Sequence, residues 1–124
     1  MTDIIYKEES FKIIGVCMEV HRFLGKGLLE IVYKDAIEYE FNNLDIIYTR
    51  EKEYPVKYKD IILPHKFYAD FVVLDKIILE VKSKSTFAKE DIAQTINYLR
   101  LAKYKLGLLV NFGTSSLEYK RVVL

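Results

Sequence analysis

Residues 70–82 read DFVVLDKIILEVK, two apolar runs separated by a short polar break. The second run, IILEVK, is typical of a buried strand until its end, where Glu80 and Lys82 alternate with apolar residues. Because successive side chains of a strand point to opposite faces, Glu80 and Lys82 leave the same face of the sheet. Burying charged groups is costly unless they are paired or bind something. The stretch therefore predicts either a structural ion pair or a functional site at this strand end.

A second carboxylate, Asp70, lies in the first apolar run, on a strand that we expect to pair with IILEVK through a hairpin. If Asp70 and Glu80 reach the same face, their oxygens can share a hard cation such as Mg2+ or Mn2+, which prefers oxygen ligands. Lys82 would then stand beside that metal. Its charge would hold an attacking water or stabilise negative charge on a phosphate.

The length of the hairpin connection tests this hypothesis. A two-residue turn at residues 75–76 would pair Asp70 with Val81 and place its side chain on the opposite face from Glu80. The metal hypothesis therefore predicts an odd-length loop or a bulge between Asp70 and Glu80. A regular two-residue hairpin would count against it.

Length and composition are those of an ordinary globular chain. The 124 residues are enough for one domain with a real core, and we expect a single domain over residues 1–124. Hydrophobic residues make up 51% and charged residues 30%, which argues against disorder. The formal net charge of +1 provides no global field that would attract nucleic acid, so such binding would need a local basic patch.

The compartment is inferred from what the sequence contains. There is no apolar stretch long enough to span a bilayer and no secretory leader, so we expect a cytoplasmic protein without a membrane role. The single cysteine, Cys17, lies on an apolar helical stripe and agrees with a reducing compartment. We expect it to pack in the core.

Hydrophobic periodicity predicts an α/β fold with a mixed central β-sheet flanked by helices. The predicted order is two helices, four strands, a third helix and two strands. The predicted helices are residues 6–24, 28–42 and 87–104; the predicted strands are residues 44–50, 51–59, 65–74, 77–82, 106–112 and 117–124. The unit of strand, helix and strand over residues 77–112 predicts a right-handed parallel crossover.

Three blocks of this sequence resemble a known family. Asp70 followed ten positions later by Glu80, Val81 and Lys82 resembles the signature of the PD-(D/E)XK nuclease superfamily. The blocks EVHRFLGKGLLEIVYKDAIEYE, FYADFVVLDKIILEVKS and AQTINYLRLAKYKLGLLVNFG resemble the GxxExxY family of small bacterial and archaeal proteins. Its name pattern is met by Gly27, Glu30 and Tyr33, and the resemblance runs from about residue 11 to residue 124.

The resemblance implies a restriction-endonuclease-like core and a metal site. Asp70 and Glu80 correspond to the metal-binding carboxylates, the backbone carbonyl of Val81 to a further ligand, and Lys82 to the catalytic lysine. Glu30 resembles an additional acid directed toward the metal or its waters. For Glu30, the alternative is that it complements the positive end of its helix.

The third predicted helix carries further residues that the resemblance places at the site. Gln94 and Tyr98, four residues apart and so on one helix face, resemble the Gln and Tyr of the RecB-like branch. For Gln94 the alternative is a solvated position, and for Tyr98 a packed core residue. Lys84 would contribute to a basic rim that contacts substrate; the alternative is a lysine of the solvated surface. The leading proline of the superfamily signature is absent, since Ala69 precedes Asp70.

The functional expectation is a divalent-metal-dependent nuclease that uses Mg2+ or Mn2+ to hydrolyse phosphodiester bonds of DNA or RNA. The alternative is a catalytically inactive nuclease-fold module that binds nucleic acid or a partner protein. A third possibility is that the chain works within a homo-oligomer, since a domain of this size offers little surface for gripping a duplex.

Overall fold

The computed structural model describes residues 4–124, and their order of elements is the expected one with a single difference. The helices are α1 (Lys7–Leu24), α2 (Glu30–Asn43) and α3 (Lys89–Ala102); the strands are β1 (Tyr48–Tyr58), β2 (Ile61–Val73), β3 (Ile77–Lys82), β4 (Leu106–Asn111) and β5 (Glu118–Val123). The five strands form one sheet in the order β1-β2-β3-β4-β5. Neighbours are antiparallel except β3 and β4, which are parallel and joined through α3 as expected. The fold class predicted from the sequence is confirmed.

The difference concerns the strands predicted over residues 44–50 and 51–59, which form one strand, β1. Pairing with β2 continues on both sides of the expected break, at Arg50 with Phe71 and at Lys52 with Ala69. Glu51, between them, has a left-handed backbone with φ of 54°. Polar residues around position 51 suggested a turn, but β2 offers a continuous partner, so the chain stays in the ladder.

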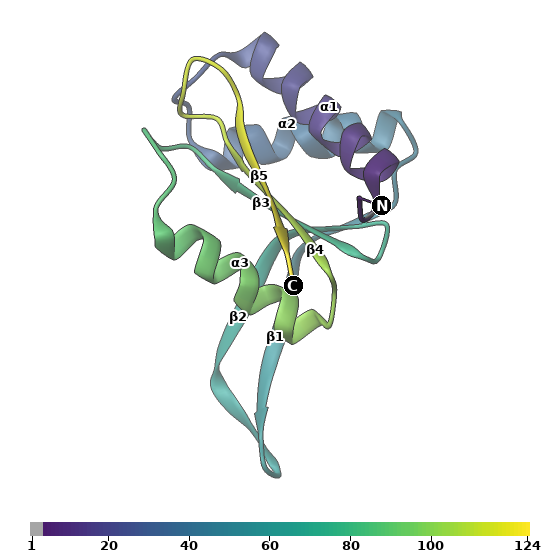
Figure 1. The fold of residues 1–124 in the computed structure, drawn as a ribbon, viewed down its shortest axis with the longest axis vertical. Coiled ribbons are helices and arrows are strands. Elements are labelled where there is room, and N and C mark those ends of the chain that lie inside the picture. The colour runs from purple at the N-terminus through teal and green to yellow at the C-terminus, as the bar shows by residue number, and fades with distance from the viewer. Residues whose placement is uncertain (1–3) are drawn as a thin grey trace.

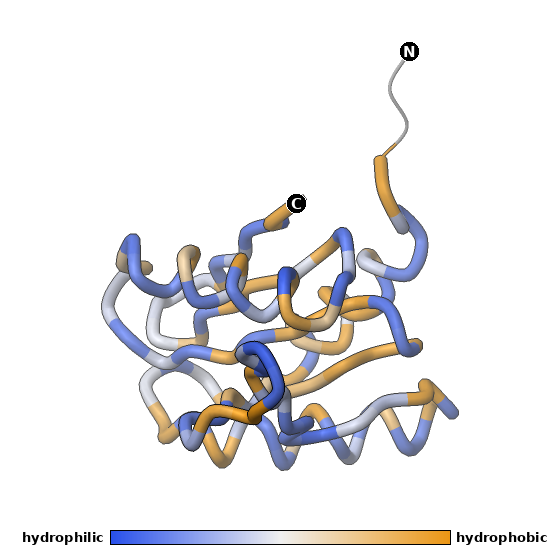
Figure 2. The backbone as a smooth tube through the Cα atoms, turned by 90° about the horizontal axis from the view of Figure 1, so that it is seen from below, coloured by the Kyte–Doolittle hydropathy of each residue, from blue (hydrophilic) through white to orange (hydrophobic). Residues whose placement is uncertain are grey.

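Helices cover both faces of the sheet (Figure 1). On one face α1 and α2 pack over a core that includes Leu79 and Val81. On the other face α3 packs over a smaller core that includes Ile78. In Figure 2 the tube is mostly orange, hence hydrophobic, through the central strands, whereas the helices alternate between orange and blue. The alternation expected for IILEVK is thus observed, with each face covered by its own helices.

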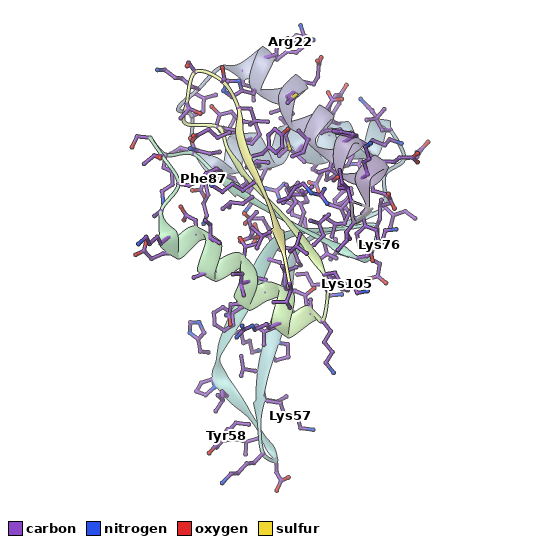
Figure 3. All side chains as sticks on the ribbon, viewed as in Figure 1. Arg22, Lys57, Tyr58, Lys76, Phe87 and Lys105 are labelled. Atoms are coloured by element: carbon purple, nitrogen blue, oxygen red, sulfur yellow. The ribbon has the colours of Figure 1, made fainter. Side chains whose placement is uncertain are left out.

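The β1–β2 hairpin extends well beyond the rest of the sheet, and Figure 3 shows Lys57 and Tyr58 near its tip. β2 pairs with β1 along most of its length but with β3 only over residues 71–73. Before residue 71, β2 therefore diverges from β3, which creates a fork between the two strands. The candidate site lies at this fork.

No helix within residues 4–124 combines the length and the apolar character needed to cross a membrane. Cys17 is fully buried in the core between the helices and the sheet, as expected from its place on the apolar stripe. Burial raises the pKa of the Cys17 thiol to about 12, which keeps it protonated and unreactive.

Gly113, two residues after the end of β4, provides a test of how closely this segment packs against the segment that follows β3. A Cβ at this position would lie 2.1 Å from the carbonyl oxygen of Lys84. We expect Gly113→Ala to lower the free energy of unfolding by about 1–3 kcal/mol, because backbone has to move to relieve the overlap. Urea denaturation followed by circular dichroism measures the change.

Gly15→Ala is the matched control, since Gly15 lies in α1 with nothing within 4 Å of the added Cβ. Alanine is the better helix former, so this variant should gain about 0.5–1 kcal/mol. Equal stabilities of the two variants would contradict the close approach of Gly113 to Lys84.

Candidate functional site

The connection between β2 and β3 has the odd length that the metal hypothesis required. Val73 pairs with Ile77, so residues 74–76 form a three-residue loop, and Phe71 pairs with Leu79. Continued by one residue, this register sets Asp70 opposite Glu80. Residues opposite each other on antiparallel strands share a face. The predicted odd-length loop is confirmed, and the hairpin brings the two carboxylates together.

At the fork, side chains take over the hydrogen bonds that the strand ladder would otherwise make. The backbone amide of Asp70 donates to Oε2 of Glu80 at 2.7 Å. The backbone amide of Val81 donates to Oδ2 of Asp70 at 2.8 Å. Each carboxylate thus accepts an amide proton from the opposite strand, so both are fixed in position where the strands separate.

Glu80 is a buried acid with a strongly perturbed proton affinity. It is 3% exposed. Burial, followed by the negative charge of Asp70, raises the pKa of Glu80 to about 8, although the amide of Asp70 and the ammonium groups of Lys82 and Lys34 act to lower it. A cation placed between the two carboxylates would favour the ionised form of Glu80 for the same electrostatic reason.

Lys82 lies two residues after Glu80 on β3, and its ammonium contacts α3. Nζ of Lys82 donates to Oε1 of Gln94 at 3.2 Å. Gln94 is an exposed residue on the second turn of α3, so the pair lies at the edge of the site facing solvent. The structure therefore brings together two of the predicted site residues.

Tyr98, one turn further along α3, is buried. Its ring packs edge-on against Phe67, with centroids 6.0 Å apart and an interplanar angle of 88°. Burial first, and then the charges of Glu80 and Asp70, raise the pKa of Tyr98 to about 12. Tyr98 therefore remains a neutral hydroxyl close to the acids, and its ring is part of the core beneath α3.

Lys34 and Glu51 also belong to the site, and the sequence reasoning missed both. Nζ of Lys34 donates to Oδ1 of Asp70 at 3.0 Å and also to Oε1 of Glu51. Burial acts to lower the pKa of Lys34, but the two carboxylates outweigh it and the pKa is raised, so Lys34 stays charged. A signal was present: Lys34 is spaced three and seven residues before Ile37 and Phe41, on the buried stripe of α2.

Glu30 is not brought into contact with the two acids. It is the first residue of α2 and is exposed, one helical turn before Lys34 on the same side of the helix. Among the described residues, no group of three or more His, Cys, Asp or Glu is placed to hold a metal ion. Tyr33, also from the GxxExxY pattern, is a buried anchor whose hydroxyl donates to the carbonyl of Gly25 and accepts from the amide of Leu28.

Lys84 is held by a structural partner at the start of α3. Its Nζ donates to both carboxylate oxygens of Asp91, at 3.1 and 2.9 Å. Burial acts to raise the pKa of Asp91, but the amide of Ala88 and the charge of Lys84 lower it overall. The backbone of Lys84 is also fixed, because the buried side chain of Asn111 accepts from its amide and donates to its carbonyl. The predicted substrate contact of Lys84 stays a prediction.

The donor chemistry at the fork fits a magnesium-type ion. Two carboxylates from opposite strands supply the oxygen ligands that such ions prefer, and Mg2+ commonly takes only one or two protein carboxylates and keeps several waters. Burial and the negative charge of Asp70 raise the pKa of Glu80, so a cation bound beside it would favour its charged form. The amide of Val81 is used by Asp70. The expected role of the Val81 carbonyl as a ligand stays a prediction.

Comparison with known proteins identifies the superfamily and supports the fold. A family model described as the PD-(D/E)XK nuclease superfamily matches residues 7–122. Comparison by sequence with curated proteins finds no match. Among solved structures, the crystal structure of SSO0001 is similar, with a TM-score of 0.60 and 16% sequence identity. The superfamily expected from the sequence is confirmed, and the narrower GxxExxY resemblance stays a prediction.

The similarity to SSO0001 covers 95% of this chain and 60% of SSO0001, so the chain spans 60% of the length of that protein. At this level of identity, the likeness establishes a shared fold.

The raised pKa of Glu80 predicts a pH-dependent stability. In the unfolded chain a glutamate ionises near pH 4.5, whereas folded Glu80 does so near pH 8. Between these values the unfolded state loses its proton first, so stability falls as pH rises, and the full penalty is present above pH 8. We expect Glu80→Gln to be more stable than the unmodified protein at pH 8, by on the order of a few kcal/mol at about 1.4 kcal/mol per pKa unit.

Urea denaturation in chelator at pH 5 and pH 8 measures this effect. The gain from Glu80→Gln should be small at pH 5 and large at pH 8. Glu30→Gln is the control, since Glu30 is an exposed glutamate that does not contact the two acids. A pH-independent effect of Glu80→Gln would show that Glu80 ionises normally in the folded protein.

Proposed function

The chain belongs to the PD-(D/E)XK nuclease superfamily, and from this premise we propose that it is a divalent-metal-dependent nuclease that hydrolyses phosphodiester bonds of DNA or RNA. The observation that carries the proposal is the pair of carboxylates at the fork, Asp70 and Glu80, each fixed by an amide of the opposite strand, with Lys82 following on β3. A structural ion pair would require only one acid and one base. Here burial and then the charge of a second acid raise the pKa of the first, a perturbation that is characteristic of a binding or catalytic site.

Asp70 and Glu80 are the proposed ligands of Mg2+ or Mn2+, with the carbonyl of Val81 as a further oxygen donor. When bound, such an ion lowers the pKa of water and neutralises charge on a phosphate. Glu30 lies at the exposed start of α2, one turn from Lys34, and in this proposal it acts on waters of the metal rather than directly on the ion. Substrate can approach from the solvent side of the fork, where Gln94 is exposed.

Lys82 is the proposed catalytic lysine. Its ammonium is a compact positive charge with three hydrogen-bond donors. It is therefore suited to hold the attacking water and to balance the negative charge that develops on the phosphate. The hydrogen bond from Lys82 to Gln94 orients that ammonium along the edge of α3. Tyr98 stays neutral and supplies a hydroxyl and a rigid ring beneath the site, where a substrate contact is proposed.

One observation favours the alternative, a nuclease-fold module that binds nucleic acid or a partner protein without cleaving it. Asp70 already has a cationic partner in Lys34, so its charge is balanced without a metal. In such a module the acids would be structural. Binding that is sensitive to salt, persists in chelator and survives Asp70→Ala would support this alternative.

The nuclease proposal predicts that Glu80→Ala and Lys82→Ala lower the rate of Mn2+-dependent cleavage by about 100-fold or more, because each removes a group that acts on the reacting phosphate or its water. Single- and double-stranded DNA and RNA are incubated with each variant in Mn2+ and in chelator. Circular dichroism confirms that the variants are folded.

Lys105→Ala is the matched control for Lys82→Ala. Lys105 is an exposed lysine beyond the end of α3, away from the start of that helix (Figure 3), and its loss should leave the rate unchanged. Intact substrates after prolonged incubation of the unmodified protein with Mn2+ would argue against a nuclease.

A further inference from the structure

Three elements meet at the ammonium of Lys34. Lys34 comes from α2, Glu51 from β1 and Asp70 from β2, and Lys34 donates to both acids. The side chains of Lys34 and Asp70 are 11% and 15% exposed, whereas that of Glu51 is 46% exposed. The ammonium is thus enclosed on the side of Asp70 and open to solvent on the side of Glu51.

This ammonium is built into the fold rather than resting on its surface. Lysine is almost never buried unless it is paired, and here the carboxylates keep it charged despite its burial. Glu51 reaches it from a left-handed backbone with φ of 54°, a conformation that residues other than glycine rarely adopt. The neighbouring residues Arg50 and Lys52 keep their pairing with β2, so the departure at Glu51 is local.

A cation held by Asp70 and Glu80 would compete with Lys34. Oδ1 of Asp70 accepts from Lys34 and Oδ2 accepts from the amide of Val81, so both oxygens of Asp70 are in use. An ion bound to Asp70 would lie a few ångströms from a fixed positive charge and be repelled by it. Glu51 offers Lys34 a second partner that it can keep when it leaves Asp70.

We propose that Lys34 is a counterion that neutralises Asp70 while no divalent ion is bound. When an ion binds, Lys34 gives up Asp70 and keeps Glu51 as its partner, so Lys34 sets the metal affinity of the site. This inference rests on the proposed metal-dependent function. In these terms Lys34 is a positioning residue and Glu51 is its alternative partner. The pair lowers the affinity for divalent ions and keeps the empty site electrostatically balanced.

The test is binding of Mn2+ alone, without nucleic acid, followed by electron paramagnetic resonance of the free ion and by calorimetry. We expect Lys34→Met to bind Mn2+ at least about tenfold more tightly than the unmodified protein, because it removes the competing charge and keeps the length of the side chain. Lys34→Gln, which keeps a hydrogen-bond donor without the charge, should show the same direction and serves if the methionine variant does not fold.

Lys76→Met is the matched control. Lys76 forms an ion pair with Glu9 at 2.7 Å, between the β2–β3 loop and α1, and does not contact the site acids. Its loss should leave the Mn2+ affinity unchanged. A purely structural role of Lys34 would alter stability and leave Mn2+ binding as it is.

Glu51→Gln tests the second half of the proposal. In the unmodified background it should weaken Mn2+ binding several-fold, because Lys34 loses the charged partner that it would keep on leaving Asp70. In the Lys34→Met background the same change should have a much smaller effect, since Glu51 acts through Lys34. An equal loss in both backgrounds would contradict this role of Glu51.

The outcomes separate this inference from the proposed function. Tighter Mn2+ binding by the Lys34 variants supports the inference. This holds even when the unmodified protein binds Mn2+ too weakly to measure. Equal or weaker binding by these variants, with measurable binding by the unmodified protein, overturns the inference and leaves the metal site standing. No binding by any of them overturns both.

Discussion

The site depends on the three-residue length of the connection between β2 and β3. Leu74 and Asp75 both have left-handed backbones, with φ of 55°, which side-chain-bearing residues adopt at a cost of about 1–2 kcal/mol. Two hydrogen bonds hold the loop in this form, from the amide of Leu74 to Ile47 and from the amide of Lys76 to Val73. A connection shorter by one residue would shift the register and turn Asp70 to the opposite face from Glu80. The loop thus fixes a carboxylate pair located just beyond the short region over which β2 and β3 pair.

What the sequence could predict was local or periodic. β3 and β4 are short apolar runs with both faces covered, and the helices have clear apolar stripes, so their positions followed from the pattern. Asp70, Glu80 and Lys82 stood out because charges are rare in such strands. The predicted boundary between the first two strands was wrong because the sequence signal there is weak. Around Glu51 the residues alternate without a strong apolar face, and only the long partner strand β2 decides that β1 continues.

The residues that the sequence did not reveal are those whose proximity is purely tertiary. Lys34 lies 36 positions before Asp70 and 17 before Glu51. Hydrophobic periodicity relates residues within one helix or strand and does not predict contacts between residues so far apart in sequence. The family pattern drew attention to Glu30, one turn earlier on the same side of α2, which the structure leaves at the exposed end of the helix. Within α2 the spacing of Lys34 relative to Ile37 shows that its side chain is buried. To identify its partners, one has to know how α2 packs against β1 and β2.

Protein groups already partner the charged side chains at the fork, which bears on what a metal would do here. Asp70 is balanced by Lys34, the pKa of Glu80 near 8 keeps this acid largely protonated at neutral pH, and Lys82 donates to Gln94. A structural metal site behaves differently, because its ligands are unsatisfied without the ion and folding depends on it. In this chain the cores on the two faces of the sheet consist of hydrophobic side chains, and the fork lies where the strands separate. A divalent ion bound there would therefore act in chemistry or in substrate binding rather than in folding, and its affinity would reflect the cost of displacing a lysine and a proton.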